Sequence, residues 1–213
     1  MRNQETILRK EIVRIGKLLY DKGLIVATDG NISVRSSKRI ILITSSGYCK
    51  GLLKPQEIVR LSLEQEPLRI GTKSKPSSEY QMHKAIYYKR NDINAVIHAH
   101  PVYATALASS NDQTRQQTQQ WFLNLPELPL TVGQIAWVGS YPPGSKELAY
   151  AVADKMAEAD VAFLANHGIV ALGEDLTQAL YRVERIEFAS KLFMMAKLLK
   201  LNSNNPTPEI KGS

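Results

Sequence analysis

The sequence predicts a layered α/β domain, with short strands in a sheet and helices packed outside it. Three observations support this. The length of 213 residues suits one compact domain. Short apolar runs lie between turn-rich segments, as strands do. Longer stretches with apolar residues three or four positions apart, typical of amphipathic helices, alternate with these runs.

The N-terminal part begins with a helix and continues with strands. Residues 3–22 carry apolar residues at helical spacing, and Gly23 ends the predicted helix. Between Leu24 and Thr44 the apolar runs LIVA and RIILIT are separated by the turn-rich TDGN and SSKR. This alternation of short apolar runs and turn-rich segments predicts a β-hairpin or meander.

The middle of the chain alternates between helix and strand. PSSEYQMHKAIYYKR predicts a helix from about Ser78, since serines can cap it and Met82, Ala85 and Ile86 follow at helical spacing. NAVIHAH reads as a strand stopped by Pro101, and VYATALAS as a helix. The polar, glutamine-rich residues 111–120 are predicted to form a surface loop or helix end.

The C-terminal part of the chain again alternates between predicted strands and predicted helices. LPLTVGQIAWVGS predicts further short strands, and PPGSKELAYAVADKMAEAD a capped helix. VAFLANHGIVALG predicts strand, turn and strand, and a long final helix follows. No linker divides the chain, so residues 1–202 are expected to be one domain and residues 203–213 a flexible tail.

Composition narrows the class of protein. The chain is 44% hydrophobic and 22% charged, as in soluble globular proteins. It has neither the roughly 18 uninterrupted apolar residues of a membrane helix nor an apolar signal core at its start. Cys49 is the only cysteine, which fits a reducing, cytoplasmic location and excludes a multi-cysteine metal cage. Any zinc must therefore use nitrogen and oxygen ligands.

The formal charge of +7 raises the question of an anionic partner. The 27 lysines and arginines are scattered and interleaved with acidic residues, without the dense run typical of nucleic-acid binding. We therefore expect no nucleic-acid partner and no membrane partner. Attraction of a small anionic substrate is the better interpretation.

Two histidines occupy alternate positions of a predicted strand. In VIHAHP, His98 and His100 would project from one face and can share a metal ion. Alone, this pattern also fits hydrogen-bonded packing histidines. His167, in LANHGIV, lies at a predicted glycine turn, where a plain turn histidine is the simpler interpretation. The three together favour a metal site.

Three neutral imidazoles leave one zinc position open, which is typical of a catalytic site. Glu79 is the candidate acid/base beside that position. His83 follows Glu79 by four residues, on the same helical face. We interpret His83 as a packed or capping histidine.

Three short segments combine hydroxyl or amide groups with glycine or a predicted helix start. They are TDGNIS from Thr28, TSSG from Thr44, and PSSE from Pro76. Each can offer backbone N–H groups and hydroxyls to a phosphate, although each alone also fits an ordinary turn or cap. The serines before Glu79 would place such an anion next to the acid/base.

GNIS, TSSG, PSSE, HAHP and NHG, in this order over residues 5–200, resemble the class II aldolase/adducin family and its L-fuculose-phosphate aldolase-like branch. The resemblance implies a three-layer α/β/α fold around a largely antiparallel sheet. It implies a homotetramer with active sites at subunit interfaces. It also implies zinc, with manganese or cobalt as alternatives, on His98, His100 and His167, with Glu79 as acid/base and possible metal ligand. The implied phosphate pocket comprises Thr28, Asn31, Ser46, Gly47, Ser77 and Ser78.

The activity implied is reversible cleavage of a ketose phosphate, L-fuculose-1-phosphate-like, to dihydroxyacetone phosphate and a short aldehyde through an enediolate. Epimerases, dehydratases and decarboxylases of the family share this chemistry, and an adducin-head-like interaction domain shares the fold. An unrelated three-histidine zinc hydrolase would leave the phosphate segments unexplained. The TSSG segment lacks the proline often found there, and no aromatic residue follows Phe193 to supply a C-terminal tyrosine. The resemblance thus identifies no second proton donor.

Overall fold

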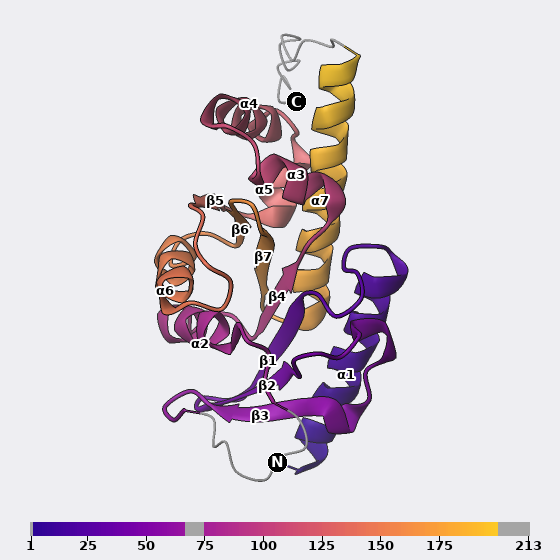
Figure 1. The fold of residues 1–213 in the computed structure, drawn as a ribbon, viewed down its shortest axis with the longest axis vertical. Helices are drawn as coiled ribbons and strands as arrows, with labels where there is room; N and C mark the ends of the chain where they lie inside the picture. Colours follow the sequence, from indigo (N-terminus) through magenta and orange to yellow (C-terminus); the bar gives the residue numbers. More distant parts are fainter. Residues whose placement is uncertain (1, 67–74, 200–213) are drawn as a thin grey trace, which may run out of the picture.

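A computed structural model describes residues 2–66 and 75–199 of the chain. Its centre is a seven-stranded sheet of order β3-β2-β1-β4-β7-β6-β5 (Figure 1). All neighbouring strands are antiparallel except β5 and β6, which are parallel. The strands are β1 (Asn31–Ser37), β2 (Ile40–Thr44), β3 (Ile58–Ser62), β4 (Ala95–Ala99), β5 (Ile135–Val138), β6 (Val161–Leu164) and β7 (Gly168–Gly173).

Helices cover both faces of this sheet. On one face lie α2 (Tyr80–Lys89) and α6 (Lys146–Lys155), and on the other α1 (Arg2–Asp21), α3 (Val102–Ala108), α4 (Asp112–Leu123), α5 (Glu127–Val132) and α7 (Leu176–Leu198). Two short 3₁₀ helices, η1 (Lys50–Leu52) and η2 (Pro55–Glu57), precede β3. In Figure 1, α2 and α6 lie to the left of the sheet and α1 and α7 to the right. The predicted three-layer α/β/α fold is confirmed.

Because side chains alternate between the two faces of the sheet, the hydrophobic core consists of two clusters, one on each face. Ile97 of β4 packs towards α3 and α7, whereas Val96 packs towards α2 and α6. Because successive side chains of a strand point to opposite faces, His98 shares the face of Val96. On β1, Ile32 belongs to the α1 and α7 side, which leaves Asn31 on the same face as His98. Asn31 and His98 therefore both lie on the face of the sheet that α2 covers.

Several predicted elements are confirmed. Helix α1 ends before Gly23, whose φ of 68° is the left-handed conformation that favours glycine after a helix. Helix α6 is capped by Ser145 and helix α7 by Asp175, whose side chains accept hydrogen bonds from the first turn. The strand NAVIHAH and the pair of strands around His167 are β4, β6 and β7.

The run LIVA, predicted as a strand, is not one. Leu24 and Ile25 are buried, but the backbone turns at Ala27 and Gly30, with φ of 46° and 69°. These left-handed residues interrupt the extended chain, so the hairpin is made by β1 and β2 instead. The apolar residues of LIVA contribute packing without strand pairing.

Residues 111–120, predicted as a surface loop or helix end, and LPLTV, predicted as a strand, both lie in helices. Residues 111–120 lie mainly in α4, where Asn111 accepts a hydrogen bond from the backbone N–H of Thr114 at 2.9 Å and so caps the helix. LPLTV lies in α5, where Leu128 and Val132 are buried one helical turn apart. Helix α2 begins at Tyr80, two residues after the predicted start. None of the helices in the described parts of the chain is long and apolar enough to cross a membrane.

Candidate metal centre

The first two histidines lie where β4 ends. His98 is the fourth residue of β4 and is fully buried, and His100 follows one residue after the strand. His98 is paired with Asn31 of β1 on one side and with Val170 of β7 on the other. The central position of β4 in the sheet therefore fixes His98 from both sides.

His167 comes from the turn between β6 and β7. Asn166 makes this turn with a φ of 59°, which asparagine tolerates better than most residues. Gly168 follows, and a side chain there would lie 2.5 Å from both the carbonyl oxygen of Ala99 and Cδ2 of His100. Glycine is thus required for the turn to approach the end of β4.

The three imidazoles converge. The ring centroid of His98 lies 4.7 Å from those of His100 and His167, and the latter two are 5.2 Å apart. Nε2 of His98 and Nε2 of His100 are 2.9 Å apart. One ligand atom from each residue lies within 4.8 Å of the others. Two ring nitrogens this close need a shared proton or cation between them.

Hydrogen bonds orient the rings. Nδ1 of His98 lies 2.9 Å from the carbonyl oxygen of Ile169, which can only accept, so this nitrogen carries the proton and Nε2 faces the cluster. Nδ1 of His100 lies 3.6 Å from a carboxylate oxygen of Asp29. Such partners on the far nitrogen are the usual support of metal-binding histidines.

Glu79 lies against the cluster and is buried. Its Oε2 accepts a hydrogen bond from Nδ2 of Asn31 at 2.8 Å and lies 3.1 Å from Nε2 of His98. Its Oε1 lies 3.4 Å from Nε2 of His167 and has no hydrogen-bond partner, although it is shielded from solvent. A buried carboxylate oxygen without a partner marks a position where a cation or a substrate group fits.

The charges of the site are coupled. Burial by itself would raise the pKa of Glu79, but the nearby charge of His98 and hydrogen bonds from His98 and Asn31 outweigh it and hold this pKa well below its ordinary value. Burial and the charge of His98 lower the pKa of His167 to about 4. Against the effect of burial, Glu79 raises the pKa of His98 in turn, so a positive charge on His98 balances the carboxylate; a divalent cation would replace that charge, since metal-binding histidines must be deprotonated.

The serine-rich segments meet beside Glu79. Ser45 and Pro76 form an antiparallel bridge, flanked by hydrogen bonds from Ser46 N–H to the carbonyl of Lys75 and from Ser77 N–H to the carbonyl of Thr44, both 3.0 Å long. Ser46 and Gly47 thus lie close in the fold to Ser77 and Ser78. Glu79 occupies the N-cap position of α2 without capping it, and its N–H donates to Ser77 Oγ at 3.3 Å.

Thr28 and Asn31 are arranged differently. The buried Lys50 donates through Nζ to the carbonyl oxygens of Thr28 and Tyr48, at 2.6 and 2.8 Å, and so joins the loop of Thr28 to the segment after Gly47. The side chain of Asn31 is bonded to Glu79 and His83. The structure therefore places Asn31 at the carboxylate. Neither Lys50 nor Asp29 was singled out from the sequence, where both look like ordinary surface charges.

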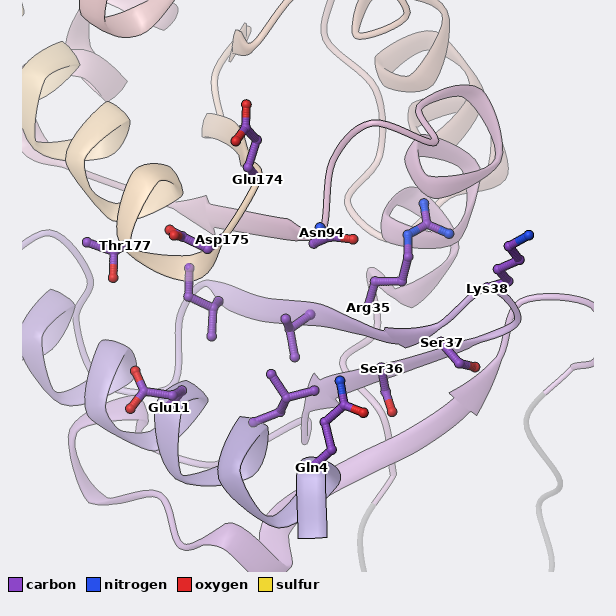
Figure 2. A pocket seen from close by; sticks show the side chains of 13 residues that line it. Gln4, Glu11, Arg35, Ser36, Ser37, Lys38, Asn94, Glu174, Asp175 and Thr177 are labelled. Atoms are coloured by element: carbon purple, nitrogen blue, oxygen red, sulfur yellow. The ribbon is translucent and has the colours of Figure 1, made fainter. Parts of the chain in front are cut away.

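A cavity of about 590 Å³ lies elsewhere, at the other end of β1. Figure 2 shows Arg35 and Lys38 on one side of it and Glu11, Glu174 and Asp175 on the other. None of the predicted site residues lines this cavity. Side chains of both charge signs line it, so its electrostatics favour neither an anion nor a cation.

Comparisons with known proteins identify the family of this chain. The family described as "Class II Aldolase and Adducin N-terminal domain" matches residues 10–194. L-fuculose phosphate aldolase of Methanocaldococcus jannaschii is 36% identical over 192 residues, which are 90% of this chain and 98% of the relative. A 5-deoxy-D-ribulose 1-phosphate aldolase of Bacillus thuringiensis is 34% identical, over 89% of this chain and 85% of its own length.

A relative with another activity and a solved structure complete the comparison. A 3-oxo-tetronate 4-phosphate decarboxylase of Escherichia coli is 32% identical, over 90% of this chain and 88% of its own length. The crystal structure of a sugar-phosphate aldolase from Thermotoga maritima superposes with a TM-score of 0.81 at 26% identity, over 95% of this chain and 99% of that one. Relatives on this fold therefore include both aldolases and a decarboxylase.

Proposed function

This chain belongs to the class II aldolase and adducin family, and from that premise we propose that it is a zinc-dependent aldolase acting on a ketose phosphate. The reaction is reversible cleavage to dihydroxyacetone phosphate and a short aldehyde. An L-fuculose-1-phosphate-like sugar is the proposed substrate, in keeping with the name of the Methanocaldococcus relative.

The observation that carries the proposal is the position of Glu79. Its buried, unpaired Oε1 faces His167, while its Oε2 is fixed by Asn31 next to His98. This leaves one carboxylate oxygen available for a proton and the other anchored. A non-catalytic binding domain would have no need of a buried carboxylate in this state.

The residues act on a carbon-bound proton. In the direction of synthesis, Glu79 accepts a proton from the carbon next to the carbonyl of dihydroxyacetone phosphate. That carbon then attacks the aldehyde, whose oxygen takes up a proton from water and becomes a hydroxyl. In cleavage, water removes the proton of that hydroxyl, the bond between the two fragments breaks, and Glu79 returns its proton to the three-carbon fragment. A divalent cation on His98, His100 and His167 would stabilise negative charge on the substrate oxygens. An ionised Glu79 has a free oxygen, Oε1, that can accept the proton.

The phosphate of the substrate is proposed to bind at the bridged serine segments. The hydroxyls of Ser46, Ser77 and Ser78 and the backbone N–H of Gly47 are brought together by the bridge of Ser45 and Pro76, whose flanking hydrogen bonds already use the N–H groups of Ser46 and Ser77. Asn31 and Thr28 would complete this pocket on the side of Glu79. Gly47 has a φ of 79°, a conformation that exposes successive N–H groups and is easiest for glycine.

Product analysis tests the proposal. The zinc-loaded protein is incubated with a panel of phosphorylated ketoses and with a 3-oxo acid phosphate, and carbon fragments and carbon dioxide are measured. An aldolase releases two carbon fragments from a ketose phosphate. Release of carbon dioxide alone would instead assign the decarboxylase activity named for the Escherichia coli relative. A change of configuration or loss of water without cleavage would assign an epimerase or a dehydratase.

Further properties follow from the same premise. We propose a homotetramer with active sites at subunit interfaces and a cytoplasmic location. Manganese or cobalt can replace zinc on nitrogen and oxygen ligands. The division into a catalytic domain of residues 1–202 and a flexible tail of residues 203–213 remains a prediction, because the tail lies outside the described residues.

A further inference from the structure

A chain of hydrogen-bonded, buried polar side chains extends from Glu79 between strand β1 and helix α2. Asn31 Oδ1 lies 2.5 Å from Nε2 of His83, and Nδ1 of His83 lies 2.6 Å from Oγ of Ser33. Oγ of Ser33 lies 3.0 Å from the hydroxyl of Tyr87. His83 and Ser33 are fully buried, and Tyr87 is nearly so.

The elements explain why these groups meet. Asn31 and Ser33 are alternate residues of β1, so both point to the face covered by α2. Glu79, His83 and Tyr87 follow one another at intervals of four residues at the start and along the length of α2, so they form one row. The row on the helix and the pair on the strand interlock, which places His83 between Asn31 and Ser33.

The direction of each hydrogen bond can be worked out from the carboxylate. Ionised Glu79 can only accept, so Asn31 must turn its Nδ2 towards it. Oδ1 of Asn31 then faces His83 and accepts, so Nε2 of His83 must carry a proton. In a neutral ring, Nδ1 then accepts from the hydroxyl of Ser33.

His83 is suited to this neutral form. Burial and the charge of His98 lower its pKa to about 3. The ring therefore stays neutral, with one donor and one acceptor, over the whole range in which the protein is expected to work. No other uncharged ring of this size provides a donor on one side and an acceptor on the other.

We propose that His83 is a positioning residue for the reaction: its Nε2–H fixes the orientation of the Asn31 amide, which in turn holds the carboxylate of Glu79 towards the histidine cluster. The inference rests on the proposed role of Glu79 in proton transfer. If the Asn31 amide turned over, its oxygen would face the carboxylate oxygen at hydrogen-bond distance, and the two would repel each other. His83 opposes that orientation as long as its proton stays on Nε2, since an Nε2–H cannot pair with an amide N–H.

Kinetics of His83 variants test the inference. His83→Phe fills the space without a donor, and we expect kcat to fall by about 10- to 100-fold, the usual effect of losing a residue that orients a reacting group. His83→Gln keeps an amide N–H that can reach Asn31, and we expect it to recover kcat to within about fivefold of the wild type. Unchanged kcat in His83→Phe, or equal losses in both variants, would overturn the inference.

A control separates positioning from loss of stability. Ile86 is fully buried on α2 but takes no part in the line of polar groups, so Ile86→Ala destabilises the same helix. We expect this variant to lower the melting temperature by at least as much as His83→Phe and to keep kcat within about twofold. A parallel loss of kcat in Ile86→Ala would mean that helix stability alone explains the effect.

Nitrogen NMR gives a readout that needs no substrate. In protein labelled with ¹⁵N-histidine, the His83 ring, assigned by its absence in His83→Gln, should show the Nε2–H tautomer and no titration between pH 5 and 9. A protonated Nδ1 would overturn the inference even in an active enzyme. If the wild type cleaves no sugar phosphate while the tautomer is as expected, the proposed function fails and the hydrogen-bond arrangement stands.

Discussion

Replacement of Glu79 by glutamine is the sharpest test of the proposed chemistry. The substitution preserves the shape of the side chain and one oxygen that can accept the hydrogen bond from Asn31, 2.8 Å away in the wild type. It replaces the unpaired Oε1, 3.4 Å from Nε2 of His167, by an amide nitrogen. The side chain can then no longer accept a proton, while the packing of the site is retained.

The size of the effect follows from these contacts. General acid–base catalysis by a positioned side chain contributes roughly 10²- to 10⁴-fold, so kcat should fall by that factor, which corresponds to about 3 to 5.5 kcal/mol in activation free energy. The variant should be less stable than the wild type at neutral pH, because the lowered pKa of Glu79 means that its ionised carboxylate stabilises the folded protein, and glutamine lacks that charge. The three histidines remain, so one metal ion per chain should remain bound.

The assay measures kcat at saturating ketose phosphate, together with metal content and the melting temperature. Glu64→Gln, an exposed change of the same chemistry, is the matched control and should behave as the wild type. A Glu79→Gln protein with full metal content and turnover within about threefold of the wild type would refute Glu79 as the proton-transfer group.

Three further predictions concern the cluster and its surroundings. Joint replacement of His98 and His100 by alanine should abolish stoichiometric metal binding and activity, as measured by elemental analysis and product formation; retention of one ion per chain would contradict the site. Gly168→Ala would place a methyl group 2.5 Å from the carbonyl oxygen of Ala99, so we expect at least about 1 kcal/mol lower stability and about tenfold weaker metal binding, measured by denaturation and metal titration. The pKa of His83 is about 3 in the folded protein, against about 6.5 when unfolded, so the unfolded chain binds one more proton between these values. The contribution of His83 to the free energy of unfolding is complete above about pH 6.5 and is lost as the pH falls. When the pH is lowered from 7 to 5, the free energy of unfolding, measured with denaturant, should fall by about 2 kcal/mol less in His83→Gln than in the wild type. An equal fall in both proteins would contradict the buried neutral ring.

Helices and strands whose apolar residues recur at one clear spacing could be predicted from the sequence. The long helices α1 and α7 and the strands β4, β6 and β7 carry apolar patterns that fit only one kind of structure. The errors fell on short segments, where tertiary packing outweighs local pattern. LPLTV reads equally well as strand or helix until Leu128 and Val132 are buried one turn apart. LIVA fails as a strand because of the left-handed backbone at Ala27.

The sequence by itself determined which residues were available for chemistry: few histidines, one cysteine, and serine-rich turns next to Glu79. The alternation of strand residues was enough to place His98 and His100 on one face. Local rules of this kind act over a few residues, so they could not bring together segments as distant as His100 and His167, nor Ser46 and Ser77.

Only the tertiary structure decided the state of Glu79 and the role of His83. The sequence favoured a packed histidine at position 83, and the ring is indeed fully buried. Its hydrogen bonds, however, come from β1, about fifty residues away in the chain. The position of the proton on His83 and the charge of Glu79 depend on which donors and acceptors lie next to them in the buried site. The register of the sheet and the packing of α2 against it decide which groups these are.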